Sequence, residues 1–192
     1  MKLLEQRILE DGKVLPGGIL KVDSFLNHQL DPKLMYEMAL ELKRLYDGEG
    51  VNKILTIEAS GIAIAIMVGL VFDCPVVFAK KSKTKNISDN LYSTEVESFT
   101  HGNTNTVVCS KDYLSASDRV LIVDDFLATG AALVGLKELV EQAGGTVVGA
   151  GIAVEKVFQG GGELLKSKGM RVESLARIAA MSDHSLEFVQ EQ

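Results

Sequence analysis

The sequence has few cysteines, no long apolar run and no excess of positive charge, and each of these shortages excludes a class of protein. Its two cysteines, Cys74 and Cys109, form neither a CxxC pair nor a zinc-binding spacing, so we interpret them as reduced structural thiols. The longest apolar run, residues 62–72, is too short to span a bilayer, and the opening MKLLEQRILEDG has no secretory apolar core. We therefore expect a soluble, cytoplasmic protein that does not enter a membrane.

The charge balance and the missing nucleotide motifs narrow the functions further. A formal net charge of −6 argues against non-specific binding of nucleic acid. Local lysines, backbone amides and helix ends would have to attract any anionic ligand. Neither GxxxxGK[ST] nor GxGxxG occurs, so a P-loop and a dinucleotide fingerprint are excluded. The 192 residues are 46% hydrophobic and 24% charged, without repeats or linkers, and we expect one domain over residues 1–192.

Strand-like and helix-like segments alternate from residue 53 onward. A helix is predicted to begin at Asp31-Pro32, where Asp31 suits the N-cap and Pro32 the first helical position. Because the strand-like runs are nearly continuously apolar, they predict an α/β fold with a mainly parallel sheet flanked by helices. The core sheet is expected within residues 51–170. Its predicted strands, with two at the C-terminus, cover residues 54–57, 75–79, 106–110, 119–123, 146–154, 171–178 and 186–190.

The most informative stretch is VLIVDDFLATGAA, residues 120–132. A buried strand ends in Asp124 and Asp125, and a loop of small residues then opens an amphipathic helix. Small side chains expose the first amides of a helix, and its dipole favours a phosphate group. Two adjacent carboxylates repel each other unless they bind sugar hydroxyls or face a hydrated cation. The stretch therefore predicts a site for a phosphorylated sugar, with a ligand-free tight turn as the alternative.

A second loop of the same kind lies at residues 58–61. Ala59, Ser60 and Gly61 follow a strand and open a helix, which forms another amide-lined anion pocket or an ordinary serine cap. Lys80 and Lys81 follow the next strand. Ligands of parallel sheets bind at the carboxyl ends of the strands, so these two lysines are candidates for binding an anion.

Lys156 ends the strand that follows the helix after residue 132. Its ammonium has three donors and no acceptor, which suits the carbonyl oxygen and ring nitrogen of an oxopurine but not the amine of adenine. The alternative is a solvated pair with Glu155 at the strand end.

The stretch 120–132 resembles the phosphoribosyl-diphosphate-binding motif of the type I phosphoribosyltransferases, although Phe126 is larger than usual for its place. The resemblance implies the fold of that family, with a small hood built from N-terminal and C-terminal segments, mostly residues 1–50. It implies that Asp124 and Asp125 hold the ribose and act in catalysis, while the loop holds the 5-phosphate through Ala128, Thr129, Gly130, Ala131 and Ala132. The loop at Ala59, Ser60 and Gly61, with Lys80 and Lys81, would hold the pyrophosphate.

Over nearly its whole length the chain is similar to the bacterial members of this family that use xanthine. The similarity is carried by LKVDSFLNHQ, TIEASGIA, VDDFLATGAA and VEKVFQ. It implies that Leu20 and Asn27 of the hood close over xanthine and that Lys156 contacts the base. It also implies transfer of the phosphoribosyl group to that base in purine salvage, Mg²⁺ carried in with phosphoribosyl diphosphate rather than bound by a metal site of the protein, a homodimer, and a lid around residues 82–90.

One departure concerns the general base. Related hypoxanthine-guanine enzymes have an aspartate where this chain has Ala128. Xanthine is the more acidic purine, so we hypothesise that the enzyme binds the xanthine anion and that Lys156 stabilises it. A guanine or hypoxanthine enzyme of the same fold remains an alternative, as does a regulator that binds the donor without turnover.

Overall fold

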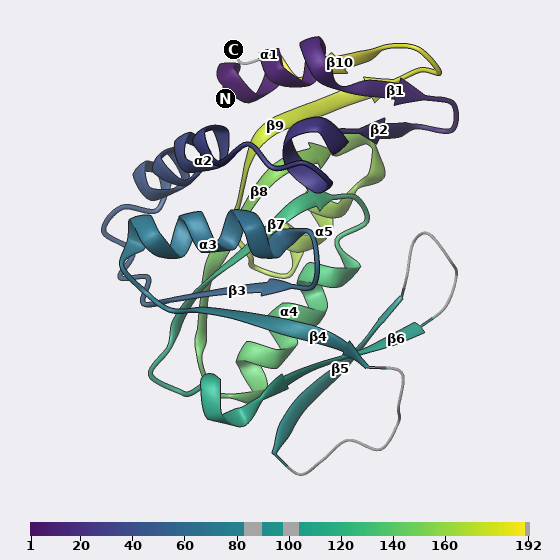
Figure 1. Ribbon diagram of the computed structural model, residues 1–192. Helices are drawn as coiled ribbons and strands as arrows, with labels where there is room; N and C mark the ends of the chain where they lie inside the picture. The colour runs from purple at the N-terminus through teal and green to yellow at the C-terminus, as the bar shows by residue number, and fades with distance from the viewer. Residues whose placement is uncertain (83–89, 98–103, 191–192) are drawn as a thin grey trace.

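The computed structural model describes residues 1–82, 90–97 and 104–190. A sheet in the order β10-β9-β8-β7-β3-β4-β6-β5 dominates it (Figure 1). The strands from β9 to β4 are parallel, while β10, β6 and β5 pair antiparallel with their neighbours. The predicted mainly parallel sheet is confirmed. The strands are β3 (Lys53–Ile57), β4 (Val76–Ser82), β5 (Leu91–Glu97), β6 (Thr104–Ser110), β7 (Arg119–Leu127), β8 (Thr146–Lys156), β9 (Val172–Met181) and β10 (Leu186–Phe188).

Helices cover both faces of this sheet, as the alternating pattern predicts (Figure 1). Helices α2 (Pro32–Leu45) and α3 (Gly61–Phe72) pack on one face, and α4 (Ala131–Gln142) and α5 (Gly161–Ser167) pack on the other. The predicted cap of α2 is present, because the Asp31 carboxylate accepts hydrogen bonds from the N–H groups of Lys33 at 3.1 Å and Leu34 at 3.2 Å. Each face therefore has its own hydrophobic core, one on either side of β7.

The two ends of the chain together form a hood at one end of the sheet, shown at the top of Figure 1. It contains α1 (Lys2–Asp11), the antiparallel pair β1 (Lys13–Leu15) and β2 (Ile19–Lys21), the π-helix η1 (Asp23–Asn27), and β10. The terminal amine of Met1 donates to the Leu175 carbonyl of β9. A weaker bond of 3.4 Å runs from the Gly17 N–H in the β1–β2 turn to the Asp183 carboxylate. The predicted hood of N-terminal and C-terminal segments is confirmed.

Strand β7 is longer than its apolar run indicates. The sequence predicts a strand over residues 119–123, whereas β7 continues to Leu127 and pairs there with Glu155 of β8. Pairing with β8 continues the strand past the apolar run. Asp124 and Asp125 therefore lie inside a strand rather than in the loop after it, and their backbone is held by the sheet.

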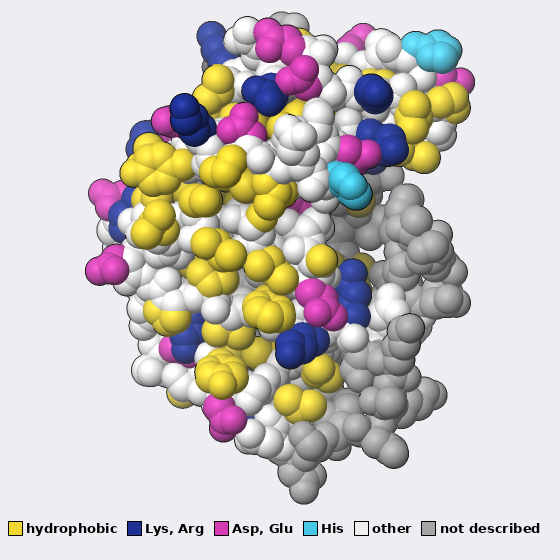
Figure 2. Space-filling view, viewed as in Figure 1, with side chains coloured by type: hydrophobic (Ala, Val, Ile, Leu, Met, Phe, Trp, Pro, Cys, Tyr) yellow, Lys and Arg dark blue, Asp and Glu magenta, His cyan; other side chains and the backbone are white. Residues whose placement is uncertain are grey.

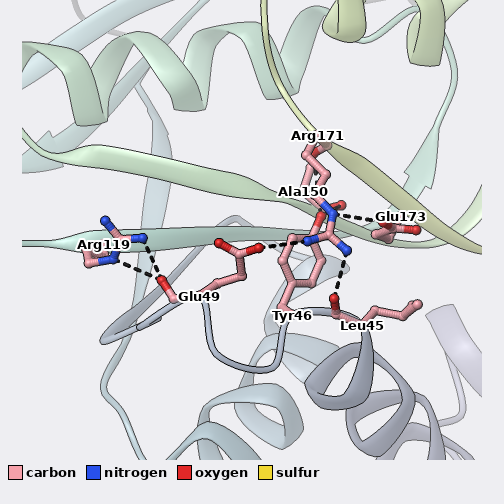
Figure 3. Close-up of polar contacts among 7 residues, drawn as sticks. All are labelled: Leu45, Tyr46, Glu49, Arg119, Ala150, Arg171 and Glu173. Carbon is pink, nitrogen blue, oxygen red and sulfur yellow. Dashed lines mark hydrogen bonds and ion pairs between the residues drawn. The ribbon is translucent and has the colours of Figure 1, made fainter.

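A polar network ties the amino ends of β7 and β9 to the end of α2 (Figure 3). The buried Tyr46 hydroxyl donates to the Ala150 carbonyl at 2.9 Å, and the Arg171 guanidinium lies 4.5 Å from the centre of its ring. Arg171 also pairs with Glu49 at 3.1 Å, while Arg119 donates to the Glu49 carbonyl at 2.9 and 2.6 Å. This end of the sheet is therefore closed by groups that satisfy one another.

Three further expectations concern a membrane span, residues 92–99 and residues 82–90. In the described parts of the chain, no helix has the length and apolar composition needed to cross a bilayer. The sequence also predicts an antiparallel hairpin over residues 92–99, but residues 92–97 belong to one strand, β5, which pairs antiparallel with β6, and residues 98 and 99 lie outside the described residues. Most of the lid predicted around residues 82–90 also lies outside them.

Candidate active site

A cavity of about 220 Å³ lies at the carboxyl ends of β3 and β7. Parallel α/β sheets bind their ligands at this edge. The cavity brings together the acid pair, the small-residue loop after β7, the loop after β3 and one lysine of β4. Its lining includes Glu58, Ser60, Lys81, Asn105, Asp124, Asp125, Phe126, Ala128, Thr129, Gly130, Ala131 and Ala132.

The acid pair lies on the cavity wall with both side chains largely buried. Asp124 is 6% exposed and Asp125 is 7% exposed. Burial and the neighbouring Asp125 carboxylate raise the pKa of Asp124 well above its usual range. Among the described residues, the one hydrogen bond that the Asp124 carboxylate accepts comes from the N–H of Asp125, at 3.0 Å. Asp124 is thus a buried acid in need of a further partner.

Asp125 joins three separate segments. Its carboxylate accepts a 3.1 Å hydrogen bond from the Ser60 hydroxyl of the loop after β3. In the amide orientation that satisfies its neighbours, Asn27 of η1 donates to the other Asp125 oxygen at 3.0 Å. The two residues predicted for the base and for the ribose are therefore in direct contact, and the hood is tied to the acid pair.

Gly61 leaves room for the acid pair at the start of α3. A Cβ atom at this position would lie 2.8 Å from Asp124 Oδ1 and 2.2 Å from the hydroxyl of Thr56. That hydroxyl is buried and has no hydrogen-bond partner among the described residues. An unpaired buried polar group costs stability, so an under-satisfied hydroxyl lies at the start of α3, close to the acid pair.

The small-residue loop turns sharply into α4. Gly130 is the N-cap and has φ +86°, a left-handed conformation that glycine adopts at low cost. The first amides of a helix have no partners within the helix, and here residues 131–133 line the cavity. The loop therefore offers N–H groups and partial positive charge to an anion.

The two lysines of β4 lie in different places, and only one of them lines the cavity with the loop after β3. Glu58 and Ser60 line the cavity, and the Glu58 carboxylate accepts from the Lys81 N–H at 2.7 Å. Ala59 follows Glu58 through a cis peptide bond. Lys81 lines the cavity, whereas Lys80 lines a separate pocket and lies 5.7 Å from the Phe78 ring. The structure therefore brings Lys81, but not Lys80, to the acid pair.

The residues predicted for the base lie toward the hood. Burial lowers the pKa of Lys156, whose ammonium donates to the Gly18 carbonyl at 2.8 Å and lies 5.8 Å from the centre of the Phe126 ring. Phe126 in turn lines the cavity. Leu20 is 7% exposed and belongs to the hydrophobic core on the side of α2 and α3. The Leu20 side chain thus supports the hood from within.

Some cavity residues were not among the predicted site residues. Glu58 opens the second small-residue loop, so its place in the chain was a usable signal. The sequence marks Phe126 only by its size, and the position of Phe126 beside Lys156 depends on the pairing of β7 with β8. Asn105 lies in β6 and comes from a polar stretch without a pattern. Cavity walls built by separate strands leave little trace in the local sequence.

Comparison with known proteins now decides the family. A family model described as "Phosphoribosyl transferase domain" matches residues 21–176, which includes every element around the cavity. The chain belongs to the phosphoribosyltransferase family. This phosphoribosyltransferase is 51% identical over 191 residues to a xanthine phosphoribosyltransferase of Limosilactobacillus reuteri (strain DSM 20016), covering 100% of both chains.

Two further relatives agree with this membership. A xanthine phosphoribosyltransferase of Bacillus cereus (strain AH187) is 50% identical over 192 residues, covering 100% of this chain and 98% of the relative. The crystal structure of adenine phosphoribosyltransferase from Thermoanaerobacter pseudethanolicus superimposes with a TM-score of 0.73 at 26% identity, covering 91% of this chain and 99% of the other. The type I phosphoribosyltransferase fold is thereby confirmed, together with its helix-flanked sheet and hood.

Proposed function

We propose that this phosphoribosyltransferase transfers the 5-phosphoribosyl group of phosphoribosyl diphosphate to xanthine, giving xanthosine monophosphate and pyrophosphate in purine salvage. The observation that carries the proposal is the cavity in which a buried acid pair faces a small-residue helix opening. Relatives that are 50–51% identical over the full chain bear the name of this enzyme and supply the choice of base.

The donor is held by three groups of residues in this proposal. Asp124 and Asp125 accept hydrogen bonds from the ribose hydroxyls, which supplies the partners that the Asp124 carboxylate lacks. The amides and small side chains of Ala128, Thr129, Gly130, Ala131 and Ala132 surround the 5-phosphate. The loop of Ala59, Ser60 and Gly61, with Lys81, binds the pyrophosphate. Lys80 lies outside the cavity and is assigned at most a long-range attraction for the donor.

The reaction is a displacement at the anomeric carbon of the donor. The purine gives its proton to the solvent before it binds, and the lone pair of a ring nitrogen of the resulting anion then forms the new C–N bond as the C–O bond to pyrophosphate breaks. Because positive charge develops on the ribose, the buried carboxylates beside it stabilise the transition state. The walls fix the two reactants in line, which contributes through orientation.

The base is recognised from the hood side. The Lys156 ammonium leaves the Gly18 carbonyl to donate to an oxygen of xanthine, and Asn27 leaves Asp125 to offer both a donor and an acceptor. Leu20 keeps the hood packed above the base. Because Ala128 cannot act as a general base, xanthine binds as its anion and Lys156 balances the charge.

The acid pair also fits the Mg²⁺ ion that phosphoribosyl diphosphate would bring. Carboxylate oxygens are the ligands that this cation prefers, and its charge would offset the burial and the Asp125 carboxylate that raise the pKa of Asp124. The described residues contain no cluster of three or more metal-ligating side chains, so the remaining ligands would be donor oxygens and water. The ion would neutralise charge on the leaving pyrophosphate.

The direct test is pyrophosphate release from phosphoribosyl diphosphate with xanthine, guanine, hypoxanthine and adenine in parallel. The proposal requires that xanthine gives the highest kcat/KM and adenine the lowest. Faster turnover of guanine or hypoxanthine would identify the enzyme as their transferase instead. Donor binding without turnover of any base would favour a regulator.

The assembly proposed for the active protein is a homodimer. Helix α3 is apolar all round, with no charged residue, yet Ile66 is 53% exposed and Leu70 is 68% exposed. Figure 2 shows hydrophobic side chains gathered over α2 and α3, where Tyr36 and Leu40 are also exposed. Exposed apolar patches of this kind mark interfaces. Light scattering should give twice the chain mass of 20.7 kDa. Leu70→Glu should shift it to the monomer, while Leu9→Glu on exposed α1 should not.

The proposal also includes a cytoplasmic location and a single domain. Burial raises the pKa of both thiols, Cys109 to about 11, which suits unreactive cysteines in a reducing cytoplasm. The core on the side of α2 and α3 runs without a break from hood residues into the sheet. Residues 1–192 therefore act as one domain, with residues 1–50 as the hood part and residues 51–170 as the core sheet.

A further inference from the structure

Three consecutive glycines, Gly160, Gly161 and Gly162, lie directly behind the loop at residues 128–132. The short 3-10 helix η3 (Val157–Gln159) follows β8, Gly160 joins it to α5, and Gly161 and Gly162 are the first two residues of α5. Three glycines in a row cost conformational entropy on folding, so a chain keeps them where other side chains do not fit. Their surroundings differ from one another and show which of them needs to be glycine.

Gly161 holds the loop from behind by a backbone hydrogen bond. Its N–H donates to the Ala128 carbonyl at 3.0 Å. The carbonyl and the N–H of a trans peptide point in opposite directions, so this bond turns the Thr129 N–H away from α5. Among the described residues, the loop lines the cavity and α5 does not. The bond therefore orients an amide of the loop toward the ligand side.

The approach of the two backbones leaves no room for a side chain on Gly161. A Cβ atom there would lie 2.3 Å from the Ala128 carbonyl oxygen and 2.8 Å from the Gly130 nitrogen. Real contacts of this kind are never so short, so the loop would have to move. A Cβ atom on Gly130 would likewise lie 3.2 Å from the Gly161 carbonyl oxygen. Two glycines meet here backbone to backbone.

The neighbouring glycine extends this support to the strand that carries Lys156. A Cβ atom on Gly162 would lie 2.1 Å from Glu155 Oε1. Glu155 is a buried acid, 6% exposed, and its other oxygen pairs with Arg177 at 3.4 Å. Glu155 precedes Lys156, so the end of β8 contacts the hood through Lys156 and the back of the phosphate loop through Glu155 and α5.

We propose that Gly161 is a positioning residue for the donor's 5-phosphate. It acts through Ala128 and Gly130: its N–H sets the direction of the Thr129 amide, and its missing side chain lets the loop sit at the depth the phosphate needs. The inference rests on the proposed function, because it assigns the loop to the donor. It goes beyond that function because Gly161 itself touches no substrate.

The test compares Gly161→Ala with Gly160→Ala in the full-length protein. Gly160 has φ +78°, and a Cβ atom there would meet no other atom within 4 Å, so its substitution adds backbone strain without touching the loop. Gly161→Ala should raise the KM and Kd for phosphoribosyl diphosphate by about 10- to 100-fold, with the KM for xanthine changed less than about twofold. Gly160→Ala should lower the melting temperature and leave both constants near those of the wild type.

Unchanged donor constants in a folded Gly161→Ala variant would overturn the inference while leaving the proposed function intact. Equal loss in Gly160→Ala would overturn it too, because strain alone would then explain the effect. If the wild-type chain neither bound nor used the donor, the proposed function itself would fail, and this inference with it.

If the Gly161→Ala variant does not fold, a second measurement, on the wild-type protein, tests the same role. Amide hydrogen exchange at Gly161 reports directly on its bond to Ala128. Ribose 5-phosphate, which carries the same phosphate, should slow this exchange at least about tenfold if it fixes the loop in place, whereas xanthine alone should not. An amide exchange rate at Gly161 that ribose 5-phosphate leaves unchanged would contradict the proposed role.

Discussion

The two ends of β7 each hold a buried aspartate, and the two carboxyls are in opposite situations. Asp118 directly precedes the strand and accepts 2.8 Å hydrogen bonds from the Lys53 ammonium and the Ser115 N–H. Burial alone would raise its pKa, but these two donors outweigh burial and hold the pKa below its usual value. Asp124 lies near the other end, where burial and Asp125 raise its pKa well above the usual value.

The contrast separates residues that stabilise the fold from residues that need a ligand to complete their contacts. Around the amino ends of the strands, the polar groups of Figure 3 satisfy one another, as Asp118 and Lys53 do. Around the carboxyl ends, the Asp124 carboxylate accepts only the N–H of Asp125 among the described residues, and the buried Thr56 hydroxyl has no partner there. A protein tolerates such unpaired groups where a ligand completes them.

Asp125→Ala should have the largest effect. Removal of the carboxylate deletes the ribose contact and also unties Asn27 and Ser60, so kcat/KM for the donor should fall by about 100-fold or more. Steady-state kinetics with the donor varied will measure it. A variant with near-normal donor kinetics would contradict the ribose assignment.

Lys156→Met should have the second largest effect, because it impairs use of the base. Methionine keeps the bulk beside Phe126 but removes the ammonium, so the KM for xanthine should rise by about 10- to 100-fold, as expected for a lost charged hydrogen bond. Donor binding, measured by calorimetry, should stay within about twofold of the wild type. Lys80→Met is the matched control, since Lys80 lies outside the cavity. Equal damage from both substitutions would point to a general charge effect instead.

Asp118→Asn should lower stability and leave catalysis alone. It weakens a largely buried ion pair with Lys53, and a cost of about 2 kcal/mol is expected. For a chain of this size that corresponds to about 4–8 °C in melting temperature. Because the folded pKa lies below the unfolded value, the stabilisation by Asp118 is present above the unfolded pKa and lost as pH falls through the folded pKa. Thermal scans should therefore show a lower melting temperature for the variant at neutral pH, and this difference should disappear at acidic pH.

Asp124→Asn should have the smallest effect on stability, and the opposite sign. An ionised carboxylate at this site costs stability at pH 7, so the variant should melt at a higher temperature by the equivalent of about 1 kcal/mol. The folded pKa is raised, so the stability from protonated Asp124 is full below the unfolded pKa and lost as pH rises through the folded pKa. The gain should therefore shrink toward pH 4. A lower melting temperature at pH 7 would contradict the account.

The sequence predicts the fold and the site loops because local patterns determine both. Alternating apolar strands and helices require a covered parallel sheet, and small residues after Asp124 and Asp125 require a helix opening at its edge. Contacts between distant segments leave no such local pattern. The bond between Asn27 and Asp125 depends on a π-helix in the hood. Lys80 and Lys81 diverge because β4 continues to Ser82, past the predicted end at residue 79, through its pairing with β6, and neighbouring residues of a strand point to opposite faces.

The most direct test of the division is calorimetric titration of phosphoribosyl diphosphate, with Mg²⁺, into the wild type, Asp118→Asn and Asp124→Asn at pH 7. The wild type and Asp118→Asn should bind the donor with the same affinity, despite their different melting temperatures. Asp124→Asn should bind it at least about tenfold more weakly while being the more stable protein. Equal affinity in all three proteins would contradict the assignment of the carboxyl end of β7 to the donor.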